Sequence, residues 1–538
     1  AEALTRIEPA LDDGLVEPDD RAGRFAFTHA LVSSTLVAEL NAARLAQHHA
    51  RITGVIEALR ADDLEPWVED LAHHAAEGLI AGTAPQALTY ARRAAASAEA
   101  AQSSADVALQ LRRAVAAAAL IPGFPVQERR DLVHRLGIAL RDTNADDGRT
   151  MLIEAARLAE AQDDSHALAA ILASLDTESL WAGYDWSLHD AGVVAAVERA
   201  RARPGLSDRD RTLLTMALAG ELTYLDNARS NRLFAEAETM AAPLDDPVLS
   251  ARVLLRWFAS VSGPSGRPTR ASIGDRLIAL DRDTVLPTRL RPLAHLARVS
   301  AALEEGDIER ARRCVATARM LAHPVRTPTG WAHLQWAEAG LALLDGDLAR
   351  ARAHAAALRP ALQRVRPYTA DSSPASILAV VECEAGDTDA ALGWLRALLA
   401  SPYAEPIHWL EAWILAEGGR TEEARAALAG FDGPLPDDWL CVPLTTAAIH
   451  AAAAVGDLRF LRRHLPGLEP VADRFVFVGE GGLCLGPAGL AAAAAHAALG
   501  DPAAARAHAE RALAITERMG AVLWLPRVHR LLDELAAT

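Results

Sequence analysis

Six short turns, each centred on a glycine, divide residues 304–501 into segments of similar length. The glycines are Gly306, Gly346, Gly386, Gly419, Gly456 and Gly500, and an aspartate follows all of them except Gly419. Glycine tolerates the positive φ with which many helices end, and an aspartate side chain caps the free N–H groups of the next helix. The glycines lie 33 to 44 residues apart. A helix–turn–helix unit repeated at this spacing predicts a helical-repeat array.

A second regular position lies five residues after each glycine. Leu461 occupies it in one unit, and alanine occupies it in the other five: Ala311, Ala351, Ala391, Ala424 and Ala505. The pattern resembles the tetratricopeptide repeat (TPR), in which a glycine and an acidic residue separate two helices and small residues follow on the second. The family's period of about 34 residues is not kept, and most of its Trp, Gly and Tyr positions are missing. The resemblance implies an all-α, right-handed superhelical solenoid of degenerate TPR-like helix pairs.

The composition of the 538-residue chain fits such an array. Hydrophobic residues make up 51% of it but aromatic residues only 5%, and alanine supplies much of the difference. Alanine favours helices and lets them approach closely. A chain of this length exceeds what one compact core usually holds, whereas repeats pack only on their neighbours.

Charge and motif content exclude several functions. The net charge of −17 argues against a nucleic-acid-binding face. All 54 basic residues are arginine, so the chain has no lysine for a Walker A phosphate loop. The four cysteines are too scattered for zinc or redox motifs. We expect a cytoplasmic chain that is not an enzyme, binds neither duplex DNA nor ATP by itself, and has no membrane span.

Residues 1–62 have a different pattern. A helix over 1–12 precedes two short extended runs, 14–18 and 24–28, which flank a polar turn at 19–23. Such runs around a glycine-bearing turn predict a β-hairpin. Two further helices are expected, one from His29 to Leu40 and one ending near residue 60. This order predicts the end of a winged-helix module.

The segment from Arg24 to Arg44 carries a second resemblance. Its sequence RFAFTHALV, followed by Leu36 and Ala38-Glu-Leu40, resembles large ATP-binding bacterial transcriptional regulators of the STAND class, of the LuxR or SARP type. Residues 70–74 and 87–95 and the C-terminal stretch 503–535 are similar to their TPR-like sensor region. The resemblance implies the sensor region of an activator of secondary-metabolite genes.

That resemblance also implies partners. The ATPase domain, with its ATP or ADP, and the DNA-binding domain would lie outside this chain, and the sensor region would contact the ATPase domain. His29 would contact the nucleotide phosphates in the longer protein; otherwise it is a polar residue beside the start of a helix. The alternative function is a plain TPR protein-interaction scaffold without ligand switching.

Stretches rich in proline and glycine divide residues 63–538. We expect TPR-like repeats over 63–262, an irregular joint over 263–292 that is rich in proline and glycine, and further repeats with a capping helix over 293–538. The oligomeric state is left open, and a homo-oligomer is compatible with the sequence.

The first helix of a TPR unit lines its concave face, so turn positions predict inward residues. Positions thirteen, ten and six residues before five of the turn glycines are Leu293, Leu296, Ser300, His333, Trp336, Gly340, Ser373, Ser376, Val380, Pro406, Trp409, Trp413, Pro443, Thr446 and His450. Among them, His333, Trp336, Trp409, Trp413 and His450 are the predicted sites for an effector or protein partner, because large side chains anchor ligands. The alternative is that the tryptophans pack between helices.

Two other features predict ordinary structure. The pairs His48-His49 and His73-His74 are adjacent on helices, so their side chains point to different faces and do not predict a metal site. The glycine-rich run 479–486 lacks the spacing of a nucleotide-binding loop and predicts a loop.

Overall fold

The computed structural model of the chain forms two compact units, residues 1–139 and residues 140–538. It describes residues 2–18, 25–101, 103–141, 145–175, 178–181, 191–324, 327–366, 369–399, 404–430, 433, 435 and 437–537. The domain boundaries expected from the sequence stay predictions.

The first unit begins with a helix, a hairpin and a helix, as expected. Strands β1 (Val16–Pro18) and β2 (Phe25–Phe27) pair antiparallel, with Val16 opposite Phe27. The predicted turn at 19–23 lies outside the described residues. The helices are α1 (Glu2–Asp12), α2 (Ala30–Ala38), α3 (Ala42–Leu59), α4 (Val68–Glu77), α5 (Ala84–Ala100), α6 (Ser104–Ala119) and α7 (Val126–Arg141). The winged-helix assignment of this end stays a prediction.

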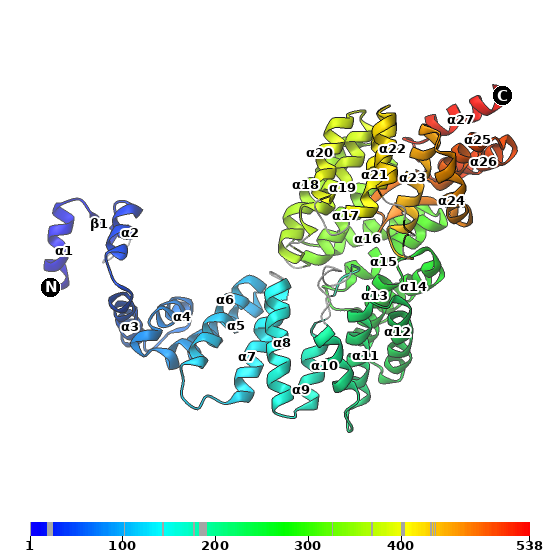
Figure 1. Cartoon of the computed structure of the whole chain (residues 1–538). Coiled ribbons are helices and arrows are strands. Elements are labelled where there is room, and N and C mark those ends of the chain that lie inside the picture. Colours follow the sequence, from blue (N-terminus) through cyan, green and yellow to red (C-terminus); the bar gives the residue numbers. More distant parts are fainter. Residues whose placement is uncertain are drawn as a thin grey trace. The chain divides into compact units, whose positions relative to one another are not determined.

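The second unit is a row of helices in which sequence neighbours pack against one another (Figure 1). Its first part contains α8 (Ala145–Ala161), α9 (Ser165–Ala173), α10 (Ala191–Arg201), α11 (Asp208–Leu222), α12 (Asn227–Ala241), α13 (Pro247–Ser260) and α14 (Arg267–Thr284). Helix α14 occupies most of the stretch 263–292 that we expected to be an irregular joint. Pro268 lies in its first turn, where proline starts a helix instead of breaking one.

The second part of this unit holds the predicted pairs. They are α15 (Arg291–Glu305) with α16 (Ile308–Leu321), α17 (Pro328–Leu344) with α18 (Leu348–Val365), α19 (Ser372–Glu384) with α20 (Thr388–Leu399), α21 (Ala404–Glu417) with α22 (Thr421–Ala429), α23 (Cys441–Val455) with α24 (Leu458–Leu468), and α25 (Ala488–Leu499) with α26 (Pro502–Met519). The final helix is α27 (Leu525–Ala537). The all-α, TPR-like repeat fold is therefore confirmed. None of the described helices is long and apolar enough to cross a membrane.

The turns between paired helices have the chemistry that the sequence predicts. All six turn glycines have positive φ, between 72° and 84°. The aspartate after each of the five Gly-Asp turns accepts a hydrogen bond from a backbone N–H in the first turn of the next helix; Asp347 accepts from Arg350 at 2.9 Å. The residues five positions after the glycines are fully buried, because the second helix packs there against the first.

A β-hairpin interrupts the last repeats. Strands β3 (Phe475–Val478) and β4 (Leu483–Pro487) pair antiparallel with a bulge at Val476 and Phe477. The stretch 479–486, expected to be a loop, thus forms the turn of the hairpin and most of its second strand. The sequence of β4 does not alternate between polar and apolar residues, because both faces of the strand are buried.

The turn glycines generate a first prediction. Gly386 has a φ of +84° and an added Cβ would meet nothing, so Gly386→Ala introduces backbone strain alone. We expect a loss of about 1 kcal/mol of unfolding free energy, measured by urea denaturation. Gly393→Ala is the matched control, because Gly393 is exposed inside α20 with free space around it. That variant should be neutral or more stable by up to about 1 kcal/mol, and equal effects at both positions would contradict the prediction.

Candidate binding cavity

The hairpin β3–β4 lies against the first helices of several repeats. It contacts α15, α17, α19 and α23, which are the helices predicted to form the inner wall. The contact with α17 has almost no space: a Cβ on Gly340 would lie 1.6 Å from the carbonyl oxygen of Gly481. A Cβ on Gly482 would lie 2.1 Å from the Trp336 indole. Glycines on both sides thus permit the hairpin to lie directly on the helix.

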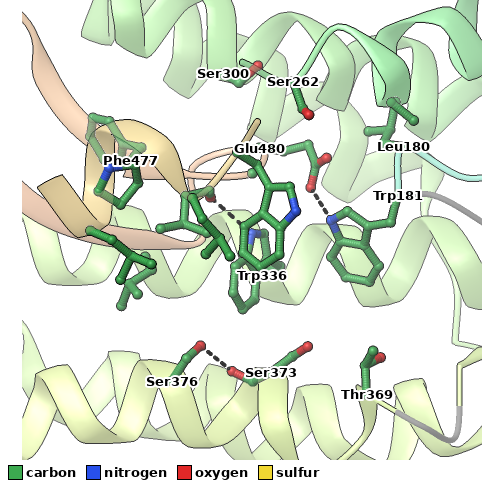
Figure 2. Close-up of a pocket in the computed structure, with 18 of the residues that line it drawn as sticks. Leu180, Trp181, Ser262, Ser300, Trp336, Thr369, Ser373, Ser376, Phe477 and Glu480 are labelled. Carbon is green, nitrogen blue, oxygen red and sulfur yellow. Dashed lines mark hydrogen bonds between the residues drawn. The ribbon is translucent and has the colours of Figure 1, made fainter. Parts of the chain in front are cut away.

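A buried carboxylate fixes the hairpin turn. The Trp181 indole N–H donates to Glu480 Oε2 at 2.8 Å, and His333 Nδ1 lies 3.2 Å from the same oxygen (Figure 2). The Leu180 N–H donates to His333 Nε2, so Nε2 is the acceptor and Nδ1 is the donor toward Glu480. The side chain of Glu480 is 2% exposed. These two donors compensate the cost of burying its charge.

A cavity of about 200 Å³ remains between the hairpin and the helices. Its walls are mainly apolar and include the rings of Trp181, Phe258, Trp336, Trp439 and Phe477. Figure 2 shows serines on two opposite sides, with Ser262 and Ser300 facing Ser373 and Ser376 across it. An apolar cavity with a few convergent polar groups is the usual form of a small-molecule site.

Two buried side-chain oxygen atoms of the cavity wall have no hydrogen-bond partner among the described residues. They are Ser300 Oγ, on a side chain that is 3% exposed, and Glu304 Oε2. The other oxygen of Glu304 accepts from Arg270 at 2.5 Å, and Arg270 also donates to the Gly263 carbonyl at 2.7 Å. Buried polar atoms are normally paired, so these two atoms mark a position where a ligand could supply the missing bonds.

The structure places the predicted inward residues in different environments. Five of them line the cavity: Ser300, Trp336, Ser373, Ser376 and Pro443. His333 does not line it but is fully buried behind the hairpin turn, where it holds Glu480. The side chain of Pro406 lies outside the described residues.

Trp409, Trp413 and His450 do not line the cavity. Trp409 and Trp413 are 1% and 4% exposed, and the Trp409 ring packs against Phe460 of α24 at 5.4 Å. The two tryptophans therefore pack between helices, as the alternative interpretation predicts. His450 is partly buried, and desolvation lowers its pKa to about 4, with Glu417 acting against the shift.

His29 is exposed and forms the N-cap of α2, without a side-chain capping bond. This position matches the ordinary interpretation of the residue; its contact with a nucleotide stays a proposal.

Sequence reasoning missed Trp181 and Glu480. Trp181 lies 152 residues before His333 in the sequence, and nothing local indicates that the centroids of the two rings lie 3.9 Å apart. Glu480 had a usable signal, because it lies in a glycine-rich turn between two short apolar runs, a pattern typical of a hairpin.

Comparison with known proteins assigns no family to this chain. No protein-family model matches the sequence, and no curated protein matches it significantly. Among solved structures, the Cut9 complex with Hcn1 from the APC/C has 12% identity and a TM-score of 0.37, covering 88% of this chain and 96% of that chain. Yeast Tom70 has 11% identity and a TM-score of 0.34, covering 88% and 97%. A circular tandem repeat protein has 16% identity and a TM-score of 0.13, covering 94% and 96%.

The contact at Gly340 predicts that one methyl group will displace the hairpin. Gly340→Ala places a Cβ against the backbone of Gly481, which cannot move without the hairpin. We expect a lower melting temperature and faster amide hydrogen exchange over residues 475–487. Gly393→Ala, also inside a helix, should neither lower the melting temperature nor speed exchange in the hairpin. Unaltered exchange in the hairpin of the Gly340 variant would contradict the prediction.

The burial of Trp409 and Trp413 gives a third prediction. Trp409→Ala and Trp413→Ala should each cost about 3–5 kcal/mol of unfolding free energy, because each leaves a cavity in the core. Trp394→Ala is the matched control, since Trp394 lies on α20 and is 44% exposed. If chemical denaturation shows a similarly small loss for all three variants, the two side chains do not lie in the core.

Proposed function

We propose that the chain is a helical-repeat binding protein whose cavity takes up a small, largely apolar molecule that carries a hydrogen-bond donor. The pair of unpartnered atoms, Ser300 Oγ and Glu304 Oε2, is the observation that carries this proposal. A carboxylate oxygen accepts hydrogen bonds, and a serine hydroxyl both donates and accepts them. A ligand hydroxyl or amine would therefore satisfy both atoms, while the aromatic walls would bind its apolar body.

A protein-interaction scaffold is the second candidate. The inner faces of α15, α17, α19 and α23 already hold an extended segment, the chain's own hairpin, which supports binding of chain segments to this wall. A partner peptide would have to displace the hairpin and its anchor at Glu480, whereas a small molecule needs only the existing cavity. The cavity therefore favours a small molecule as the primary ligand.

We propose further that the chain is part of a bacterial transcriptional regulator. The cavity would then be the site that binds its effector. The N-terminal segment supports such a context, because large apolar side chains there are solvent-exposed: Leu15, Phe27, Leu31, Leu36 and Val37. Exposed apolar clusters commonly mark an interface, and an ATPase module of the same protein would cover this one. A phosphate-binding loop encoded upstream of Ala1 in the parent gene would support the regulator over the plain scaffold.

A pair of probe molecules tests the cavity. Isothermal titration calorimetry should show saturable binding of 2-naphthol, which has two apolar rings and one hydroxyl donor. Binding of 2-methoxynaphthalene should be weaker, because it lacks the donor that Ser300 and Glu304 require. Ser373→Trp fills the cavity and should weaken 2-naphthol binding by about tenfold or more.

The control for this experiment is Ser272→Trp, the same change at an exposed position on α14. It should bind 2-naphthol like the unmodified chain. Absence of saturable binding, or equal binding by both tryptophan variants, would contradict the proposal.

A further inference from the structure

Three imidazoles converge in the first unit. One ring nitrogen from each of His49, His73 and His74 lies within 4.8 Å of the other two. His49 Nδ1 and His74 Nδ1 are 2.8 Å apart, and the three ring centroids are separated by 5.0 to 5.6 Å. Two nitrogen ligands of one tetrahedral zinc ion are about 3.3 Å apart, so small side-chain rotations would bring all three onto a common ion.

The packing of α3 on α4 creates this arrangement. Gly78 ends α4, and a Cβ there would lie 3.2 Å from the Ala50 backbone nitrogen. The missing side chain lets the two helices approach closely, so His49 on α3 lies opposite the adjacent histidines on α4. Adjacency on one helix argued against a shared metal for His73 and His74, but their ring centroids lie only 5.0 Å apart in the structure.

Electrostatics around the rings suit a cation in two respects. His74 lies in the last turn of α4, where the helix dipole is negative. Glu77 follows on the same helix, and its negative charge acts on both His49 and His74. Desolvation and the neighbouring His73 lower the pKa of both rings.

We propose that His49, His73 and His74 bind one zinc ion, with water or Glu77 in the remaining position. Three histidine ligands and an open fourth position are a known zinc arrangement, and imidazole suits zinc better than magnesium or calcium. The site is independent of the proposed cavity ligand, and it would fasten α3 to α4.

One neighbouring charge opposes the ion. Arg113 Nη2 lies 3.2 Å from His73 Nδ1, while Nη1 of the same guanidinium donates to Gln110. A cation at the three rings would be repelled by this guanidinium. The geometry therefore makes a directional prediction: Arg113→Gln should tighten zinc binding, although it removes a hydrogen-bond partner of His73.

Calorimetry of the whole chain with zinc chloride, after removal of metals with EDTA, tests the site. The unmodified chain should bind zinc saturably. His49→Ala and His74→Gln should each weaken that step by about 100-fold or more, because each removes a direct ligand and loss of even an outer partner costs 10- to 100-fold. Zinc should also raise the melting temperature of the unmodified chain but not of these variants.

Two controls make the result decisive. His48→Ala changes the exposed histidine next to His49 and should leave zinc binding unchanged. His508→Ala tests the other group of candidate ligands among the described residues, Glu469, His496 and His508, which lies in the second unit. No zinc binding, binding unaffected by His49→Ala, or binding lost in His508→Ala instead would overturn the proposal.

Discussion

A single buried carboxylate joins parts of the second unit that are far apart in the sequence. Glu480 accepts from the Trp181 indole and pairs with His333, and thereby links residues before α10, on α17 and in the hairpin turn. Leaving this charge buried without both donors would cost several kcal/mol. The position of the hairpin, and with it the floor of the cavity, depends on this interaction.

The hairpin changes what the inner wall of the repeats can do. In an open array, the side chains of the first helices would face solvent and be available along their length. Here the glycines Gly340, Gly481 and Gly482 allow backbone to lie against helix and ring, and the hairpin contacts α15, α17, α19 and α23. What stays accessible is a confined apolar space, with Ser300 and Glu304 as its unsatisfied polar atoms. Such a space selects ligands by size and by one or two hydrogen bonds.

The two units also use histidine differently. The His333 ring accepts a hydrogen bond from a backbone N–H and donates one to a carboxylate. The rings of His49, His73 and His74 instead face one another, where mutual repulsion would oppose any charge on them. The first arrangement stabilises a loop by itself, whereas the second is the basis of the proposed zinc site.

Local sequence alone determined the helix pairs and their turns, because a Gly-Asp turn acts through backbone φ and a single capping bond within a few residues. The turn positions also pointed to Ser300, Trp336 and Ser376, which line the cavity. They pointed equally to Trp409 and Trp413, which are buried elsewhere. Only the tertiary structure decided what those residues meet. Trp409 is covered by α24 and Trp336 by the hairpin, and Trp181, one of the two partners of Glu480, lies 299 residues away from it in the sequence. Burial of this kind depends on contacts between distant segments, which no local pattern encodes.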